Sequence, residues 1–177
     1  MFSKEGIKST IQTLIIAFIL SIGIRTYVAE AKVIPTGSMI PTIKIGERVL
    51  VDKVYYKIDD IERKDIIVFR PTPTLQKEKI YTEDFIKRVI GIPGDTIRVE
   101  GGKVYINDEP LKEDYIKEEP NEDFGPFTVP PNSVFVMGDN RNNSYDSRKW
   151  GVVPMNYIKG RAIFRFWPIN RIGLLER

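Results

Sequence analysis

An uncharged, mostly apolar run near the N-terminus constrains this chain more than any other feature. Residues 9–24 read STIQTLIIAFILSIGI and carry no charge. As a helix they would span roughly 24 Å, at about 1.5 Å per residue, against ~30 Å for a hydrocarbon core. The basic side chains that border the run, Lys8 and Arg25, can extend toward the membrane surfaces. We therefore predict a transmembrane helix over residues 9–29 and a separate folded domain over residues 30–177.

Charge placement predicts the orientation of this helix. Lys4 and Lys8 precede it, and basic residues favour the cytoplasmic side, so we expect residues 1–8 in the cytoplasm and the folded domain outside. Two alternatives remain open. The run could be a helix buried in a globular core, or it could be a signal peptide that is cleaved after the small residues of AEA, residues 29–31.

Composition excludes several kinds of chemistry. The 177 residues include neither cysteine nor histidine, which excludes disulfides and thiolate nucleophiles and leaves zinc without its usual ligands. The net charge is +3, and residues 1–25 account for +2 of it, with three basic residues against one acidic residue. The remaining chain is nearly neutral and shows no basic stripe for phosphates. We expect no metal, no cofactor and no nucleic-acid partner.

Beyond residue 31 the hydrophobic pattern predicts a mostly β domain. Short runs rich in β-branched and aromatic residues occupy residues 47–56, 65–70, 85–92, 95–100, 103–107, 133–138 and 160–167. Gly101 and Gly102 join two of these runs, and both glycines can adopt the positive φ that a two-residue β-hairpin turn requires.

Two segments are expected to be irregular. Residues 70–79 are rich in proline, threonine and lysine. An acidic loop is expected at about residues 108–130, because six carboxylates and two prolines fall within residues 113–127. Its acidic residues lack the alternating spacing of a Ca²⁺-binding loop, so we predict a solvated surface segment there.

A possible nucleophile and a possible base stand out from this pattern. Ser38 lies within PTGSMIPT, residues 35–42. A nucleophilic serine needs a base, and without histidine the candidate is a lysine kept neutral by burial. Strand alternation places Lys87 on one face with Phe85 and Val89, which is an apolar environment for an ammonium group. The alternative is that Lys87 is an edge-strand lysine that discourages aggregation.

A third, strongly polar stretch reads GDNRNNSYDSR at residues 138–148. Asp146 and Arg148 can form an ion pair, and Ser144 or Ser147 can hold a lysine amine through a hydroxyl oxygen. Taken alone, the stretch is equally consistent with a loop of Asx turns.

Together these stretches resemble the type I signal peptidases of bacteria. PTGSMIPT, KRVIGIPGD (residues 87–95) and GDNRNNSYDSR follow an N-terminal apolar helix in this order, as in the compact, single-anchor, Gram-positive-like form of that family. GERVLV (residues 46–51) matches a fourth motif, with Glu47 where aspartate is commoner, a change that we expect to be harmless. The resemblance extends to about Gly151. It implies a signal-peptidase/repressor-protease-like β fold with an N-terminal transmembrane helix.

The resemblance also implies a serine endopeptidase that uses a Ser-Lys dyad. Ser38 would be the nucleophile and Lys87 the general base. Thr36 would supply a hydroxyl to the oxyanion hole beside the backbone N–H of Ser38, and Ser144 would orient the Lys87 amine. The residues that would support this arrangement are Asp146, Arg148 and Arg88.

The implied activity is removal of signal peptides from exported preproteins, after an Ala-x-Ala-like site, at the outer face of the cell membrane. The substrate would bind as an extended strand, and we predict that Ile34 and Ile86 line shallow apolar pockets for its small side chains. The expected partners are preproteins, the lipid bilayer and the secretion translocon. Residues 164–168, FRFWP, predict a core strand, with a lipid-contacting aromatic patch as the alternative.

Two other functions remain open. A repressor-type self-cleaving protease shares the Ser-Lys chemistry, but it would carry a DNA-binding domain where this chain has the apolar run. An anchored, non-catalytic β-domain that binds an extracellular partner is the non-enzymatic alternative.

Overall fold

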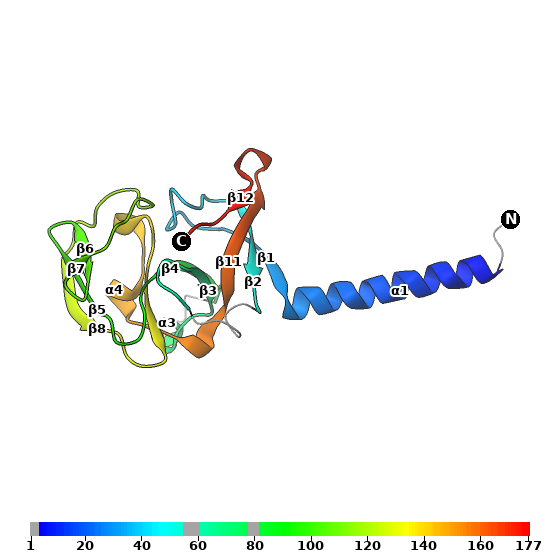
Figure 1. The fold of residues 1–177 in the computed structure, drawn as a ribbon, viewed down its shortest axis with the longest axis horizontal. Coiled ribbons are helices and arrows are strands. Elements are labelled where there is room, and N and C mark those ends of the chain that lie inside the picture. Colours follow the sequence, from blue (N-terminus) through cyan, green and yellow to red (C-terminus); the bar gives the residue numbers. More distant parts are fainter. Residues whose placement is uncertain (1–3, 55–60, 78–81) are drawn as a thin grey trace.

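The computed structural model describes residues 4–54, 61–77 and 82–177, which form one long helix and two antiparallel sheets (Figure 1). Helix α1 (Lys4–Tyr27) projects from one end of the β domain, and the smaller sheet lies at the other end. The larger sheet has eight strands in the order β1-β2-β11-β3-β4-β9-β10, with β12 paired to β11. The smaller sheet has the order β7-β6-β5-β8. The predicted mostly β fold is therefore confirmed.

The larger sheet contains β1 (Ala29–Val33), β2 (Arg48–Asp52), β3 (Ile66–Phe69), β4 (Phe85–Gly91), β9 (Ser133–Met137), β10 (Val153–Pro154), β11 (Ile158–Trp167) and β12 (Gly173–Leu174). The smaller sheet contains β5 (Thr96–Glu100), β6 (Lys103–Ile106), β7 (Glu109–Pro110) and β8 (Phe124–Thr128). The short helices are α3 (Pro73–Lys77) and α4 (Ser147–Trp150), and the 3₁₀ turns are η1 (Arg141–Asn143), η2 (Met155–Tyr157) and η3 (Ile169–Arg171).

Each run that the sequence predicts to be a strand contains one, namely β2, β3, β4, β5, β6, β9 and β11. Residues 55 and 56 of the first run lie outside the described residues. Gly101 and Gly102 form the predicted hairpin turn between β5 and β6, with φ values of 55° and 80°. Glycine adopts this pair of conformations without steric cost, which is why the glycine pair located the turn correctly.

Strand β3 is buried on both faces, which explains its continuous apolar sequence. Ile66 and Val68 pack into one hydrophobic cluster, while Ile67 and Phe69 pack into another that includes Trp150. Because successive side chains of a strand point to opposite faces, the same four residues serve two layers of core. The central strands that carry the candidate site are therefore held on both sides.

A third hydrophobic cluster joins the two sheets. Ile90 and Phe135 of the larger sheet pack with Ile97 of the smaller one. The Phe135 ring lies 5.3 Å from the ring of Phe124 on β8, measured between centroids. The smaller sheet is thus packed against β4 and β9.

The segment that we expected to be an irregular acidic loop is more ordered than predicted. Strands β7 and β8 fall within residues 108–130, and β8 pairs with β5. The prediction missed β8 because carboxylates and prolines dominate the segment, whereas Phe124 and Phe127 provide the apolar contacts that hold it. Similarly, α3 forms within residues 70–79 around the buried Leu75.

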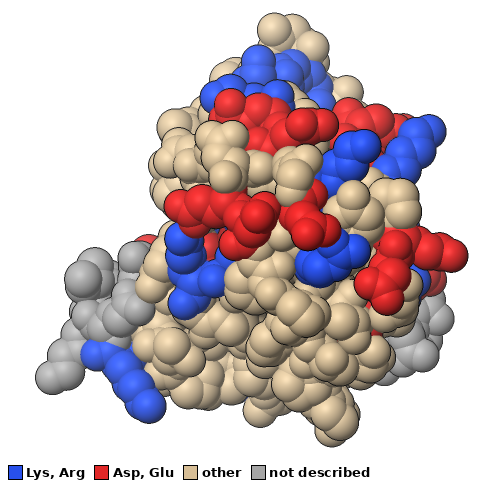
Figure 2. All heavy atoms as spheres, turned by 90° about the vertical axis from the view of Figure 1, so that its left-hand side faces the viewer, with Lys and Arg blue, Asp and Glu red and all other residues tan. Residues whose placement is uncertain are grey.

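Figure 2 views the molecule from the end that carries the smaller sheet, where acidic and basic side chains lie close together. Some of the acidic segment is exposed as predicted. Glu122 forms a surface ion pair with Lys149 at 2.5 Å, and Glu118 forms one with Lys117 at 3.6 Å. Such exposed pairs contribute little to stability.

The N-terminal helix departs from the prediction in two respects. First, the helix ends at Tyr27, and residues 29–31 (AEA) begin strand β1, which pairs along its length with β2. The second difference concerns the membrane. Within the part of the chain that the structure describes, no helix has both the length and the apolar character needed to cross a bilayer. The transmembrane helix predicted over residues 9–29 is therefore not supported.

Candidate active site

Ser38 lies in a turn between β1 and β2 that is tied together at its base. The Ile34 N–H donates to the Glu47 carbonyl oxygen at 2.9 Å, and the Gly46 N–H donates to the Ile34 carbonyl oxygen at 2.8 Å. The buried Glu47 carboxylate also pairs with Arg171 at 2.6 Å. These contacts hold the turn, so that Ser38, only 7% exposed, has a defined position at the edge of a cavity.

Lys87 reaches Ser38 from strand β4. Its Nζ lies 2.7 Å from the Ser38 Oγ and donates to the carbonyl oxygen of Ile86 at 3.1 Å. The residue is 3% exposed, and its Nζ lies 5.7 Å from the centroid of the Phe85 ring. The edge-strand alternative is wrong, because β4 runs between β3 and β9 in the interior of the sheet.

Burial changes the acidity of this amine. The loss of hydration lowers the pKa of Lys87 from 10.5 to about 8, while the negative charges of Asp146 and Asp139 oppose that shift. At mildly alkaline pH the side chain is therefore largely a neutral amine. A neutral amine in contact with a hydroxyl can accept its proton.

Thr36 lies on the same turn, and its Oγ1 is 3.4 Å from the Ser38 Oγ. Thr36 and Ser38 both line the cavity. A hydroxyl in this position borders the space where the oxygen of an attacked carbonyl would lie.

The polar stretch at residues 138–148 contains the predicted ion pair. Two nitrogens of Arg148 each lie 2.9 Å from a carboxylate oxygen of Asp146. The fully buried Asp146 also accepts from the Gly138 N–H at 3.1 Å and from the Arg148 N–H at 3.3 Å. Of the two candidate serines, Ser147 accepts from the Val136 N–H at 2.9 Å, so it holds the stretch to β9.

Ser144 is placed close to the dyad but does not bond to it in this structure. Its hydroxyl is buried and has no hydrogen-bond partner. A Cβ at Gly138 would collide with that hydroxyl and with the carbonyl oxygen of Ser38, so glycine is required for this close packing. The predicted bond from Ser144 to the Lys87 amine stays a prediction.

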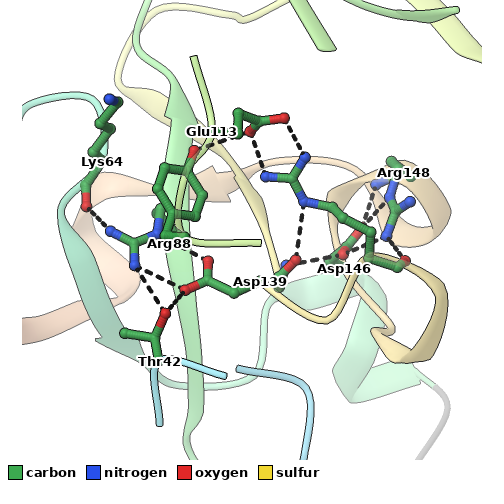
Figure 3. A network of polar contacts seen from close by, with 10 residues as sticks. Thr42, Lys64, Arg88, Glu113, Asp139, Asp146 and Arg148 are labelled. Carbon is green, nitrogen blue, oxygen red and sulfur yellow. Dashed lines mark hydrogen bonds and ion pairs between the residues drawn. The ribbon is translucent and has the colours of Figure 1, made fainter. Parts of the chain in front are cut away.

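Arg88, the neighbour of the candidate base, forms a buried ion pair with Asp139 (Figure 3). Its Nε and Nη2 donate to the two carboxylate oxygens at 2.9 and 2.8 Å. Thr42, from the Ser38 turn, donates to the same carboxylate at 2.5 Å. Asp139 therefore links β4 to the turn that carries the candidate nucleophile.

The sequence analysis missed Asn140 as a further link. Its N–H donates to the carbonyl oxygen of Ser38, and its Nδ2 donates to that of Gly37, each at 3.0 Å. Asn140 lies in the polar stretch that we singled out, but its partners are about a hundred residues away in the chain, and local pattern contains no sign of them.

The cavity beside Ser38 has a volume of about 580 Å³ and is lined by residues 35–38, 82–87, 143 and 145. Ile86 is in this lining. Ile34 is not; it is 2% exposed and packs with Met39 and Ile43 in the core. Within the described ranges, no group of three or more metal-ligating side chains stands together.

A serine hydroxyl in contact with a buried amine, beside an open cavity on a β scaffold, is the arrangement expected of a hydrolase of the serine type. Comparisons with known proteins narrow the class. The family model "Signal peptidase, peptidase S26" matches residues 7–167. Signal peptidase I of Leptolyngbya laminosa is 52% identical over 97% of this chain and 83% of its own length.

Two other signal peptidases are also similar to this chain in sequence. Probable signal peptidase I-2 of Synechocystis sp. is 51% identical over 93% of this chain and 75% of its own length, and signal peptidase I S of Bacillus subtilis is 34% identical over 96% and 94%. A crystal structure of a signal peptidase I from Enterococcus faecalis has a TM-score of 0.49 and 34% identity, covering 59% of this chain and 97% of that one. The chain belongs to the S26 family and is a type I signal peptidase.

Proposed function

We propose that this signal peptidase cleaves preproteins by Ser-Lys chemistry. The Ser38 Oγ attacks the scissile carbonyl carbon as its proton passes to the neutral Lys87 amine. The resulting ammonium then protonates the leaving amino group, and the C–N bond breaks. Water, with its proton taken by Lys87, hydrolyses the acyl-enzyme and restores Ser38. The 2.7 Å separation of Nζ and Oγ, at a site where burial brings the amine's pKa to about 8, carries the proposal.

The other site residues have distinct roles in this scheme. Thr36 donates its hydroxyl to the developing oxyanion together with the Ser38 N–H. Ser144 turns its free hydroxyl to the Lys87 amine when substrate is bound, a role supported by the hydroxyl's burial without a partner. Asp146, with Arg148, and Arg88 brace the elements that carry these groups.

The substrate is the cleavage region of a signal peptide ending in an Ala-x-Ala-like sequence, bound as an extended strand in the cavity. The cavity runs between the Ser38 turn and the start of β4, both of which line it. Ile86 forms part of an apolar wall for a small side chain. Because Ile34 lies in the core, it supports that wall from behind.

The location of the enzyme follows from its substrate and from its exposed apolar side chains. Helix α1 exposes large apolar residues along its length, including Leu14, Phe18 and Leu20. A second exposed set lies on the Ser38 turn and the C-terminal part: Val33, Ile45, Trp167, Ile169, Ile172 and Leu174. We propose that these surfaces hold the enzyme at the cell membrane near the secretion translocon, with residues 30–177 outside.

The test is cleavage of a purified preprotein whose signal peptide ends in Ala-x-Ala, by the full chain in detergent. Mass spectrometry of the product is expected to show one new N-terminus directly after that site, and Ser38→Ala is expected to produce none. Cleavage that persists in Ser38→Ala would contradict the proposal. The family membership sets aside both the self-cleaving repressor and the non-catalytic β-domain.

A further inference from the structure

Two residues of the acidic segment, Glu113 and Tyr115, are partly buried and pack against the elements that carry the catalytic groups. The Glu113 carboxylate accepts from Arg141 Nη1 at 2.7 Å and from Nη2 at 2.5 Å, and the two side chains are 6% and 0% exposed (Figure 3). Tyr115 donates its hydroxyl to the same carboxylate at 2.9 Å. Asp114, between them in sequence, is exposed. The segment therefore contributes a specific buried contact.

Tyr115 covers the cation next to the general base. The Arg88 guanidinium carbon lies 4.0 Å from the centroid of the Tyr115 ring, and Arg88 follows Lys87 directly on β4. Asp139 binds two nitrogens of the Arg88 guanidinium, and the Tyr115 ring covers a face of the same group. Burial and the Glu113 charge raise the pKa of Tyr115 well above its usual range, which keeps the hydroxyl protonated as a donor.

Glu113 also contacts the 138–148 loop, through Arg141. Arg141 Nε donates to the Gly138 carbonyl oxygen at 3.1 Å, and the Arg141 carbonyl accepts from Arg148 Nη2 at 2.6 Å. Asn140, between Gly138 and Arg141, holds the carbonyl oxygen of Ser38. A displaced Arg141 would thus shift the loop that positions the nucleophile.

The energetics favour a positioning role over a purely stabilising one. A buried ion pair loses most of its Coulomb attraction to the cost of desolvating both charges, so it adds little net stability. Its geometry is nevertheless rigid, because a bidentate guanidinium–carboxylate pair fixes both distance and orientation. Glu113 and Tyr115 also bond to each other, and together they reach both β4 and the 138–148 loop.

We propose that Glu113 and Tyr115 are positioning residues for cleavage, which hold the Lys87 strand and the 138–148 loop in register. The inference rests on the proposed Ser-Lys mechanism. Because small misplacements of reacting groups cost up to about 100-fold in rate, the pair is expected to affect the chemical step more than substrate binding.

The test uses the full chain in detergent and a soluble peptide containing an Ala-x-Ala site. Glu113→Gln keeps the side-chain shape but removes the charge that pairs with Arg141, and we expect kcat to fall about 10- to 100-fold with KM within about twofold. Tyr115→Phe keeps the ring on Arg88 and loses only the hydroxyl bond, and a fall of about 3- to 10-fold is expected. Asp114→Asn, in the same segment, is expected to keep wild-type kcat and KM.

Thermal unfolding of each variant, followed by circular dichroism, sets an assay temperature at which all are folded. If Glu113→Gln does not fold, Tyr115→Phe decides alone. The proposal is overturned if Glu113→Gln and Tyr115→Phe have the same kcat as Asp114→Asn. It is also overturned if their loss of activity appears in KM instead of kcat. Wild type and Ser38→Ala run alongside, so that failure of the dyad mechanism, seen as cleavage by Ser38→Ala, is distinguished from failure of this inference.

Discussion

Replacing Lys87 by methionine tests the buried amine through stability as well as activity. Methionine has a similar length and no charge, so Lys87→Met removes the base and is expected to abolish cleavage. It also removes a titrating group. Because the folded pKa of about 8 lies below the value of 10.5 for the free side chain, the unfolded chain binds this proton more tightly. Protonation therefore opposes folding in full below pH 8, and the opposition fades as the pH rises toward 10.5.

The pKa difference sets the magnitude. A shift from 10.5 to about 8 corresponds to a cost of about 3 kcal/mol at pH 7 and about 1 kcal/mol at pH 10. The variant also loses the contacts of Nζ with the Ser38 Oγ and the Ile86 carbonyl oxygen, about 1 kcal/mol each. Lys87→Met is thus expected to be about 1 kcal/mol more stable than wild type at pH 7 and about 1 kcal/mol less stable at pH 10.

The assay is urea unfolding of both proteins in the same detergent at pH 7 and pH 10, followed by tryptophan fluorescence. The informative quantity is the change in the stability difference between the two pH values, about 2 kcal/mol, because the lost hydrogen bonds cancel from it. Lys103→Met, at an exposed position on β6, is the matched control and is expected to show no such change. A stability difference that is the same at both pH values would refute a buried amine with a lowered pKa.

Three further predictions concern the surroundings of the dyad. Thr36→Val is expected to lower kcat by about 100- to 1,000-fold while Thr36→Ser stays active, and equal kcat values in the two would remove this hydroxyl from the mechanism. Gly138→Ala is expected to lower kcat on the order of 100-fold, because its Cβ would displace Ser144 and the nucleophile's carbonyl; full activity would contradict the close packing seen here. A chain without α1 is expected to bind phospholipid vesicles in a flotation assay, and to bind them more weakly when it carries Trp167→Ser. No binding by either protein would rule out the exposed apolar residues of the C-terminal part as a lipid contact.

Local sequence pattern was sufficient to predict those strands and turns whose own residues show the hydrophobic or glycine pattern of the element. Short runs rich in β-branched and aromatic residues located β3 and β4, and the Gly101–Gly102 pair located the hairpin. Strand β1 was missed because AEAKV has little apolar signal of its own; it forms by pairing with β2. Ile34 was misassigned because sequence adjacency to the dyad does not tell which way a turn residue points, and the structure turns it into the core.

The candidate site could likewise be predicted only in part. The three polar motifs predicted which side chains meet, and Ser38, Lys87 and the Asp146–Arg148 pair do lie together. The acidic segment could not be interpreted from its own composition, since carboxylates and prolines are typical of solvated loops. Its buried role depends on Arg141, which is 28 residues away from Glu113 in sequence. These two residues come together only in the folded chain.

The pH dependence of kcat/KM for a soluble Ala-x-Ala peptide tests the central claim most directly, since it reports the ionisation of the free enzyme. If Lys87 in its neutral form is the base, kcat/KM rises about tenfold per pH unit at low pH and levels off above an apparent pKa of about 8. A profile that is flat between pH 6 and pH 9, or one that keeps rising to pH 10 and beyond, would contradict a buried lysine base at Ser38.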